Sequence, residues 1–443
     1  MTLLLEGMIG IPEDELTARQ HDMLERRFTP KDKDGVPCPV WSESDGFVWV
    51  PRSYLADVRS EGISFVDNTS DGYSAFGQSN AFIPREGQSE AVEGMARYLR
   101  AHWHGVLVAE CGSGKSIVGA QLAYTLGVST VVLVHRQFLE EQWIENFKVV
   151  CPDVRIGIVR GKRCEHGPDY DVVIASCQSL AGKREYPASL YRGSGLLIAD
   201  EVHIYSARHW SRIIGKFLAR YRLGLTATFR RSDGLIDVIR HHVGDVAYVM
   251  KSTSMKADVY FLSTYVEMDP REYVQVWNNE INQAWLKTKL AKVTRRNHQL
   301  IGVIRKAAKA GRKCLILSER RQQLEDLATG LVGAGVNEDD IGFLLGGMKE
   351  EKRRESSTKQ VIFSTYQLAR NALDIEDLDV LVMGTPIGDI QQTVGRVVRR
   401  IEGKKTPIVV DLIDSIPYCE GLARNRKKQY EALGYKVCRG RMG

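Results

Sequence analysis

Between residues 82 and 435 the chain alternates short, wholly apolar runs with longer stretches in which apolar residues recur every three or four positions. The short runs are rich in valine, leucine and isoleucine, which predicts strands buried on both faces, and the longer stretches predict amphipathic helices. Strands that alternate with helices are typical of a parallel sheet covered by helices on both sides. In the first half we expect strands at 105–109, 130–134, 171–175, 195–199 and 222–226, and helices at 88–101, 115–126 and 138–147.

The same alternation begins again after a less regular, helix-rich bridge at about 268–310. Two α/β units in tandem therefore fill most of the chain. In the second unit we expect strands at 313–317, 360–363, 379–383 and 407–412, and helices near 321–332, 389–400 and 421–434.

The first residues differ from the rest, because they are rich in turn formers and aromatic side chains. Residues 46–50 alternate in polarity and predict a strand, and residues 67–80 are rich in Gly, Ser and Asn, which predicts a linker. The aromatic side chains of such a small domain fit a core better than a base-stacking surface. The predicted organisation is an accessory domain at 1–78, a candidate for DNA binding, followed by units at 82–250 and 251–443.

Composition narrows the class of protein only modestly. The 443 residues suffice for about three domains. The formal net charge of +6 is compatible with a polyanionic partner. Eight cysteines without a C-x-x-C pair fit a reducing compartment. Since the sequence has neither a signal peptide nor an apolar run of about 18 residues, we expect a soluble, cytoplasmic protein that is not in a membrane (in the host cytoplasm if a phage encodes it).

Residues 109–116 read Ala-Glu-Cys-Gly-Ser-Gly-Lys-Ser, between a predicted strand and a predicted helix. In a phosphate-binding loop, glycines let backbone N–H groups surround the phosphates, while the lysine reaches the outer phosphates and the serine hydroxyl ligates Mg²⁺. The first position is Ala109 instead of glycine, and the loop alone leaves a plain glycine turn as the alternative. The predicted contacts are Gly112, Ser113, Gly114, Lys115 and Ser116.

A second signal is the apolar run 196–199, which ends in Asp200 and Glu201. This order places two carboxylates at the carboxyl edge of a parallel sheet, where ligands bind. We expect Asp200 to hold Mg²⁺ through its water shell, and Glu201 to lie at the metal and polarise the attacking water. The alternative, an acidic helix start, becomes weak when the motif follows a phosphate loop.

A third signal, Gln-Gln-Thr-Val-Gly-Arg-Val-Val-Arg-Arg at 391–400, lies in the second unit. Arg396 and Arg399 share a helix face with Gln392. A guanidinium fits phosphate oxygens and stabilises the charge that develops during phosphoryl transfer. A solvated basic face is the alternative.

Together with Leu-Thr-Ala-Thr at 225–228, these motifs follow the order and spacing of the superfamily 2 helicases and translocases, which the chain resembles over 82–435. The stretch 224–234 is most similar to the branch that includes XPB and the phage UvsW-type branch-migration helicases. The chain departs from the family pattern at Phe229, where proline is usual, at Ala372, where glycine is usual, and in reading Asp-Glu-Val-His instead of Asp-Glu-Ala-His.

The resemblance implies two tandem RecA-like lobes, an ATP-Mg²⁺ site and catalytic roles for Lys115, Glu201, Arg396 and Arg399, with Arg399 as the arginine finger. It implies a sequence-independent grip on the nucleic-acid backbone. The remaining implied roles are nucleotide contacts at Arg85, Gln88 and Asp374; coupling at His203, Thr226, Thr228 and Gln392; and nucleic-acid contacts at Arg136, Gln178, Ser179, Arg320, Thr365 and Gln367.

The function implied is an ATP-dependent DNA helicase or translocase, monomeric, that remodels forks or four-way junctions in phage recombination, repair or replication. RNA is the alternative partner, and the motor subunit of a restriction system is a further alternative. A single-lobe ATPase switch and a catalytically inactive binding module fit the motifs less well, because both arginines and all the phosphate-loop groups are in place.

Overall fold

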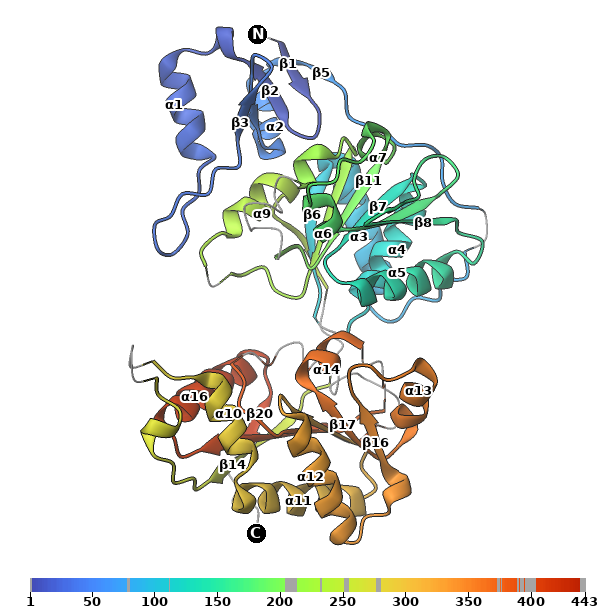
Figure 1. Cartoon of the computed structure of the whole chain (residues 1–443). Helices are drawn as coiled ribbons and strands as arrows, with labels where there is room; N and C mark the ends of the chain where they lie inside the picture. The colour runs from blue at the N-terminus through green and yellow to red at the C-terminus, as the bar shows by residue number, and fades with distance from the viewer. Residues whose placement is uncertain are drawn as a thin grey trace. The chain divides into compact units, whose positions relative to one another are not determined.

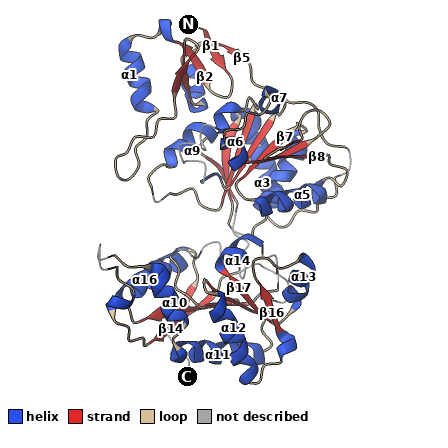
Figure 2. Cartoon of the chain, in the orientation of Figure 1, coloured by secondary structure: helices blue, strands red, loops and turns tan. Residues whose placement is uncertain are grey.

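The computed structural model describes residues 2–77, 80–110, 112–203, 213–231, 233–250, 255–275, 280–372, 377–388 and 404–438, together with residues 375, 390 and 394. The chain divides into two compact units, residues 1–252 and 253–443 (Figure 1). Helices and strands alternate in both units (Figure 2). Among the described helices, none combines the length and the apolar character needed to cross a membrane.

Unit 1 contains an eight-stranded sheet with the order β13-β6-β12-β11-β7-β10-β8-β9. Its strand pairs are parallel apart from β8 and β9, which form a short antiparallel hairpin. The strands are β6 (His104–Val108), β7 (Thr130–Val134), β8 (Ile156–Arg160), β9 (Arg163–Cys164), β10 (Val172–Ser176), β11 (Leu196–Asp200), β12 (Tyr221–Thr226) and β13 (Val246–Val249).

Helices cover both faces of this sheet, which explains why its central strands are apolar throughout. Every residue of β7 is buried. Val132 packs with the helices of one face and Val131 with those of the other. One face carries α3 (Gln88–His102), α4 (Lys115–Leu126) and α5 (Gln137–Val150), and the other carries α6 (Cys177–Ala181), α7 (Ala188–Arg192) and α9 (Ile236–Val243).

A second sheet in unit 1 is built from the first residues of the chain, in the order β3-β4-β2-β1-β5. Its core includes Leu3, Ile9 and Val50, and it continues into Leu235 and Val238 of the larger part of unit 1. The elements are β1 (Thr2–Leu5), β2 (Ile9–Pro12), β3 (Ser42–Ser44), β4 (Phe47–Val50), β5 (Ser64–Asp67), α1 (Ala18–Arg27) and α2 (Leu55–Ser60). We call this part the accessory sheet.

Two buried arginines join the accessory sheet to the larger sheet. Arg52 donates to the carbonyl oxygens of Ala219 at 2.8 Å and Arg220 at 3.0 Å. Arg222 donates to the carbonyl oxygens of His242, at 3.0 Å, and Gly7. Burial lowers the pKa of the Arg52 guanidinium to about 9, an effect that Asp67 partly offsets. Because these cations bind carbonyl oxygens inside the junction, we expect the two sheets to move as one body.

The segment predicted as a linker is bonded along the larger sheet. Ser70 N–H donates to the carbonyl oxygen of Leu218 at 2.8 Å, and Ser129 N–H donates to that of Tyr73 at 2.9 Å. Tyr73 also donates its hydroxyl to backbone carbonyls at Gly167 and Tyr170. Over the described range 67–77, the predicted linker is therefore hydrogen-bonded to the surface of the larger sheet.

Unit 2 contains a seven-stranded sheet, parallel throughout, with the order β16-β17-β15-β18-β19-β14-β20. The strands are β14 (Asp258–Thr264), β15 (Cys314–Ser318), β16 (Ile341–Leu344), β17 (Val361–Thr365), β18 (Val380–Met383), β19 (Ile408–Asp414) and β20 (Lys436–Cys438). The helices are α10 (Gln283–Ala291), α11 (Thr294–Lys309), α12 (Arg321–Gly333), α13 (Glu350–Thr358), α14 (Tyr366–Ala372) and α16 (Pro417–Ala432).

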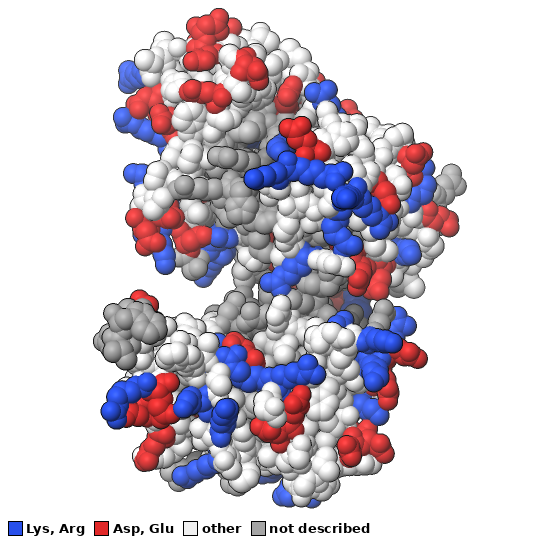
Figure 3. All heavy atoms as spheres, viewed as in Figure 1, with Lys and Arg blue, Asp and Glu red and all other residues white. Residues whose placement is uncertain are grey.

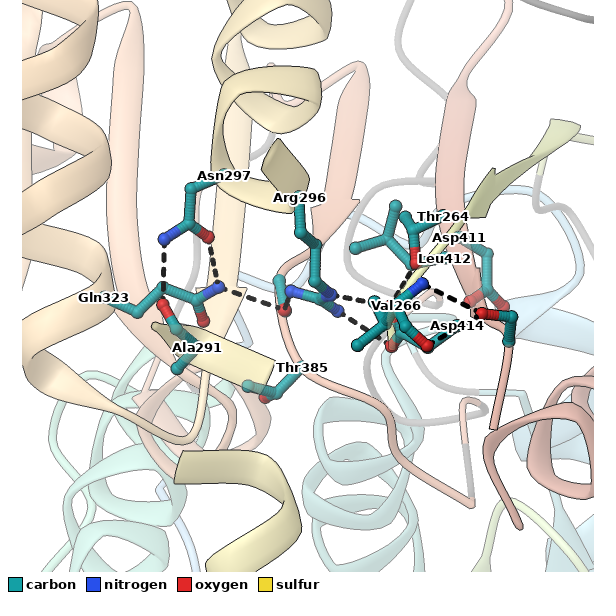
Figure 4. Close-up of polar contacts among 12 residues, drawn as sticks. Thr264, Val266, Ala291, Arg296, Asn297, Gln323, Thr385, Asp411, Leu412 and Asp414 are labelled. Atoms are coloured by element: carbon teal, nitrogen blue, oxygen red, sulfur yellow. Dashed lines mark hydrogen bonds and ion pairs between the residues drawn. The ribbon is translucent and has the colours of Figure 1, made fainter. Parts of the chain in front are cut away.

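A buried polar network fixes the carboxyl edge of this second sheet (Figure 4). Arg296 on α11 pairs with Asp414 at 2.7 Å, and both side chains are fully buried. Arg296 also donates to the carbonyl oxygen of Gly384, which follows β18, at 2.5 Å. Gln323 donates to Asn297 at 3.0 Å and accepts from the Ser318 hydroxyl at 2.7 Å. The ends of β15, β18 and β19 are thus held together by side chains of α11 and α12.

The α/β class, with two parallel sheets in tandem and a small N-terminal sheet, is confirmed. The predicted strands of both units are present, most of them shifted by one or two residues, and 130–134 is reproduced as predicted. β8, β9 and β13 of unit 1 and β14, β16 and β20 of unit 2 were not predicted. The predicted helix 389–400 lies outside the described residues except for Ile390 and Val394.

Candidate functional site

The predicted ATP-site residues of unit 1 meet at the carboxyl edge of its large sheet. β6, β12 and β11 are neighbours, with Val108 beside Thr226 and Leu225 beside Asp200. The loop after β6 and the carboxylates after β11 therefore emerge at the same edge. This is where ligands bind in parallel sheets with helices on both faces.

The loop before α4 has the backbone shape that its glycines predict. Gly112 and Gly114 have φ of 87° and 82°, which strongly favours glycine. A Cβ at Gly114 would also lie only 2.5 Å from the Gln88 side-chain nitrogen. α4 begins directly at Lys115, so its first N–H groups face the loop. Cys111, inside the loop, lies outside the described residues.

Lys115 and Glu201 form an ion pair at the phosphate loop. The Lys115 ammonium donates to Glu201 Oε1. Burial alone would raise the pKa of the Glu201 carboxyl, but Lys115 and His203 hold that pKa below its usual value. Glu201 has φ of 51°, a left-handed conformation that is unfavourable for a side chain of this kind. The ion pair thus fixes the Lys115 ammonium and the Glu201 carboxylate beside the phosphate loop.

Asp200 is held from two sides. Trp143 Nε1 donates to one carboxylate oxygen and the Glu201 N–H donates to the other, both at 3.0 Å. Burial raises the pKa of Asp200 to about 6; the Glu201 charge adds to this rise and Lys115 opposes it. Trp143 is fully buried, and its ring fills the space beside Gly119 of α4, where a Cβ would lie 2.9 Å away.

The oxygen atoms at this edge fit a magnesium–nucleotide complex. Ser116, Asp200 and Glu201 supply the hard oxygen ligands that Mg²⁺ prefers. Glu201 Oε2 is buried and has no hydrogen-bond donor among the described residues, while His203 Nδ1 lies 3.5 Å from it. An acceptor left in this state is costly unless a ligand or water satisfies it. The residues therefore fit the predicted cofactors.

A chain of hydrogen bonds leads away from Glu201. His203 Nδ1 lies 3.2 Å from the Thr226 hydroxyl. That hydroxyl donates to the Thr228 carbonyl at 2.8 Å and accepts from the Thr228 N–H at 3.2 Å. The structure thus joins three of the predicted coupling residues. The fourth, Gln392, lies outside the described residues.

Gln88, predicted to contact adenine, is bonded to the phosphate loop. Its side-chain oxygen accepts from the Arg85 N–H at 2.8 Å, and its amide donates to the Ser113 carbonyl at 3.0 Å. The side chain is 2% exposed. This geometry links the segment before α3 to the loop, and contact of Gln88 or Arg85 with the base stays a prediction.

The predicted nucleic-acid contacts of unit 1 lie after β7 and β10, which are neighbouring strands. Arg136 is exposed at the start of α5. Gln178 donates to the His135 carbonyl, and the Ser179 hydroxyl accepts from the Gly161 N–H at 2.9 Å. These residues share the sheet edge that carries Asp200, although Gln178 and Ser179 already have partners within the chain.

In unit 2 the predicted contacts lie at the ends of the adjacent strands β15 and β17: Arg320 follows β15, Thr365 ends β17 and Gln367 follows it. Arg320 donates to the Thr288 hydroxyl and to the Ala284 carbonyl, both at 2.8 Å, so it braces α10. The Thr365 hydroxyl accepts from the Leu368 N–H at 3.4 Å, and Gln367 is exposed. The remaining predicted site residues of unit 2, Asp374, Arg396 and Arg399, lie outside the described residues.

Sequence reasoning assigned no role to Trp143 or His135. A buried tryptophan requires an acceptor for its N–H, which is the signal that could have linked Trp143 to the site. Burial, with Arg136 adding to it, lowers the pKa of His135 to about 4, so this ring is neutral beside the Lys115–Glu201 pair.

Replacement of Trp143 by phenylalanine should weaken magnesium-dependent nucleotide binding. Trp143→Phe keeps a ring in the same space but leaves Asp200 Oδ2 without its donor. Because a hydrogen bond to a charged group contributes about 1.5–3 kcal/mol, we expect roughly a tenfold or greater loss in Mg²⁺ affinity. The measurement is a Mg²⁺ titration of fluorescent ADP binding. Trp285→Phe, at a 48% exposed position of unit 2, is the control. Equal Mg²⁺ dependence in both variants would contradict the role of the indole.

Comparison with known proteins finds several that are similar to the part of the chain that carries this site. Residues 81–231, which contain the phosphate loop, Asp200 and Thr226, match the family model described as "Type III restriction enzyme, res subunit". A putative ATP-dependent RNA helicase of Acanthamoeba polyphaga mimivirus is 29% identical over 87% of this chain and 75% of its own length. The DNA 3'-5' helicase XPB of Kineococcus radiotolerans is 30% identical over 55% of this chain and 44% of its own.

Among solved structures, T4 UvsW aligns over 99% of both chains, at 16% identity and with a TM-score of 0.38. The chain has the two parallel α/β sheets that its motifs predict. It is similar to superfamily 2 helicases, and this similarity supports a nucleic-acid-dependent ATPase that uses ATP.

Proposed function

We propose that this chain is an ATP-dependent DNA translocase that remodels branched DNA, such as forks and four-way junctions. One observation carries the motor part of the proposal. A continuous set of contacts runs from Lys115 through Glu201, His203 and Thr226 to Thr228. This set starts at the phosphate loop and ends on the loop that leaves β12, so a change at the nucleotide has a physical route into the sheet edge.

The contacts suggest how hydrolysis begins. When ATP enters the loop, Lys115 exchanges Glu201 for the phosphate oxygens, which carry more negative charge. Glu201 is then released to accept a hydrogen bond from the attacking water and to orient it. Magnesium, held by Ser116 and through water by Asp200, would neutralise part of the phosphate charge. Burial keeps these groups away from bulk water, which strengthens their electrostatic effect.

The release of Glu201 also changes the partner of His203. The His203 ring now lies between Glu201 and the Thr226 hydroxyl. Movement of Glu201 toward water would let the ring shift, and Thr226 would pass that shift to the Thr228 backbone. We propose that the loop after Thr226 in turn biases the nucleic-acid contacts at Arg136, Gln178 and Ser179.

Replacement of Thr226 by valine tests the relay. Thr226→Val keeps the shape but removes the hydroxyl that bonds His203 and Thr228. We expect unstimulated ATP turnover to persist and stimulation by polynucleotide to fall, because the link and not the site is broken. Thr130→Val, which removes a hydroxyl bonded to the Val128 carbonyl at 3.0 Å at the start of β7, is a matched control. Undiminished stimulation in Thr226→Val would exclude the relay.

The second unit completes the proposed mechanism through its sequence motifs. Arg396 and Arg399 would stabilise the charge that develops on the transferred phosphoryl group, with Arg399 as the finger. Asp374 would lie near the ribose and Gln392 would assist coupling. Arg320, Thr365 and Gln367 would grip the backbone of the same nucleic acid. A monomer suffices for this mechanism, because one chain carries both the nucleotide-binding groups and the nucleic-acid contacts.

The preference for branched DNA rests on energetics. Opening one base-pair step costs about 1.4 kcal/mol, so ten steps cost about 14 kcal/mol. Movement of a branch point exchanges old pairs for new ones at almost no net cost. A compact motor can therefore move a junction more easily than it can unwind a long duplex. The stretch 224–234, which resembles the XPB and UvsW branch, supports the same choice.

RNA is the second candidate partner, because the mimivirus relative is described as an RNA helicase. A restriction motor is the third, because of the description of the family model. The test measures ATP turnover and strand displacement on single-stranded, duplex, forked and four-way DNA and on RNA. We expect the largest response with four-way or forked DNA. Stimulation by RNA alone would select the RNA helicase, and travel along linear duplex without any junction remodelling would favour the restriction motor.

A further inference from the structure

A groove lies where the accessory sheet meets the larger part of unit 1, away from the ATP site. It has a volume of about 350 Å³, near the lower limit of small-molecule sites. β3 and β4 contribute Ser42, Ser44 and Trp49, and α7 contributes Tyr191 and Arg192. Lys216 lines the groove as well, and on the face of unit 1 that Figure 3 presents, Lys and Arg side chains lie among Asp and Glu side chains.

The two aromatic side chains of the groove are half-buried and fixed in place. The Trp49 ring lies against Gly10, where a Cβ would be 2.9 Å from a ring carbon, and its N–H donates to the Ser44 carbonyl at 3.3 Å. Tyr191 packs edge-on against Phe217, with ring centroids 5.1 Å apart. Fixed rings of this kind offer a face for stacking with little loss of conformational entropy.

The charge of the groove is predominantly positive. Arg192 and Lys216 are both exposed, and the Lys216 ammonium lies 5.9 Å from the centre of the Tyr191 ring. Glu6 is the one acidic residue among the described lining residues, and it accepts from the Asn68 amide at 3.3 Å. Cations beside stacking rings are the combination that binds the backbone and the bases of single-stranded nucleic acids.

The position of α7 connects this groove to the motor. α6 carries the predicted contacts Gln178 and Ser179, and only the short segment 182–187 separates it from α7. That segment holds the exposed cations Lys183 and Arg184 beside the exposed Glu185, so its charge is positive on balance. A strand leaving Ser179 can therefore follow positive charge to Arg192 and Lys216. A duplex fits less well, because its bases are stacked inward and present no free face to Trp49.

We propose that this groove binds one single strand of nucleic acid beyond the motor contacts, with a base on Trp49 and phosphates at Lys216 and Arg192. The inference rests on the proposed function, since it extends the path of the same nucleic acid. It also gives the accessory sheet a role, because this sheet supplies one wall of the groove. At a fork or junction, such a groove would hold one strand apart from its complement.

The test measures the affinity of the full-length protein for fluorescent single-stranded DNA and RNA oligonucleotides by anisotropy. Trp49→Ala should weaken binding by roughly 5- to 100-fold, the range for one base stacked on an aromatic side chain. Trp49→Phe keeps a stacking face and should restore most of the affinity. Lys216→Ala should lower the slope of log K against log salt by about 0.7, the value for one lost phosphate contact.

Lys148→Ala is the matched control for Lys216→Ala, because Lys148 is exposed on α5, on the opposite face of the sheet. A bromouracil-substituted oligonucleotide should crosslink to Trp49 or Tyr191. Three results would overturn the proposal that this groove binds a single strand: wild-type affinity in Trp49→Ala, an unchanged salt slope in Lys216→Ala, or binding of duplex alone. Each of them would leave the proposed function intact. Failure of every polynucleotide to bind or stimulate the wild type would instead defeat the proposed function.

Discussion

Lys115→Ala is expected to reduce ATP turnover by at least roughly 10²–10³-fold, the range for the loss of one group that stabilises the transition state. The lysine is the cation at the mouth of the phosphate loop, and it already pairs with Glu201 there. Its loss removes the charge that holds the outer phosphates and also deprives Glu201 of its counter-ion. The measurement is steady-state phosphate release at saturating ATP.

Polynucleotide affinity should remain near the wild-type value in the same variant, since the predicted backbone contacts follow β7 and β10 and Lys115 follows β6. Lys148→Ala, which removes an exposed lysine of α5, serves as the control for charge. Normal turnover in Lys115→Ala would refute the assignment of the ATP site. A parallel loss of nucleic-acid binding would indicate that the substitution disturbs the fold.

Arg296→Met should lower the free energy of unfolding by about 3–5 kcal/mol, because it leaves Asp414 charged, buried and unpaired. Figure 4 shows Arg296 and Asp414 with their partners. The lost side chain also bonds the Gly384 carbonyl, and Asp414 keeps only the Thr264 hydroxyl among these partners. Urea unfolding of the full chain, followed by circular dichroism, measures the change.

The double variant Arg296→Met with Asp414→Leu should recover part of this loss, since it removes the uncompensated charge as well. Lys289→Met is the surface control. Both side chains of the Lys289–Glu272 ion pair are exposed, so this pair should contribute at most about 1 kcal/mol to the free energy of unfolding. An effect of Arg296→Met no larger than that of Lys289→Met would show that the buried pair does not hold the sheet edge together.

The central strands could be predicted because helices cover both faces of each sheet. β7 and β15 are buried at every position, so their sequences contain uninterrupted apolar runs. β14 was missed because most of its residues are only partly buried, which leaves no such run. Of the accessory strands, β4 was predicted from its alternating pattern at 46–50, while β1, β2, β3 and β5 were missed because they are short and β3 is exposed throughout.

The ATP site could be predicted because parallel strands bring their carboxyl ends to one edge, so that motifs far apart in sequence meet. Contacts across that edge could not be predicted. Trp143 reaches Asp200 across 57 positions of sequence, and Arg320, expected at a nucleic acid, reaches back to α10. Such contacts depend on how helices pack over the sheet, which periodicity does not specify. A binding role for Trp49 could be inferred only from the structure, which places this side chain in a groove.

The most direct test of the account is ATP turnover by the wild-type protein measured over a range of single-stranded DNA concentrations. The contacts from Lys115 to Thr228 predict slow turnover without DNA and a several-fold, saturable rise when DNA is added. The same rate with and without every DNA and RNA tested would contradict the account, because the nucleotide and the polynucleotide would then not be coupled.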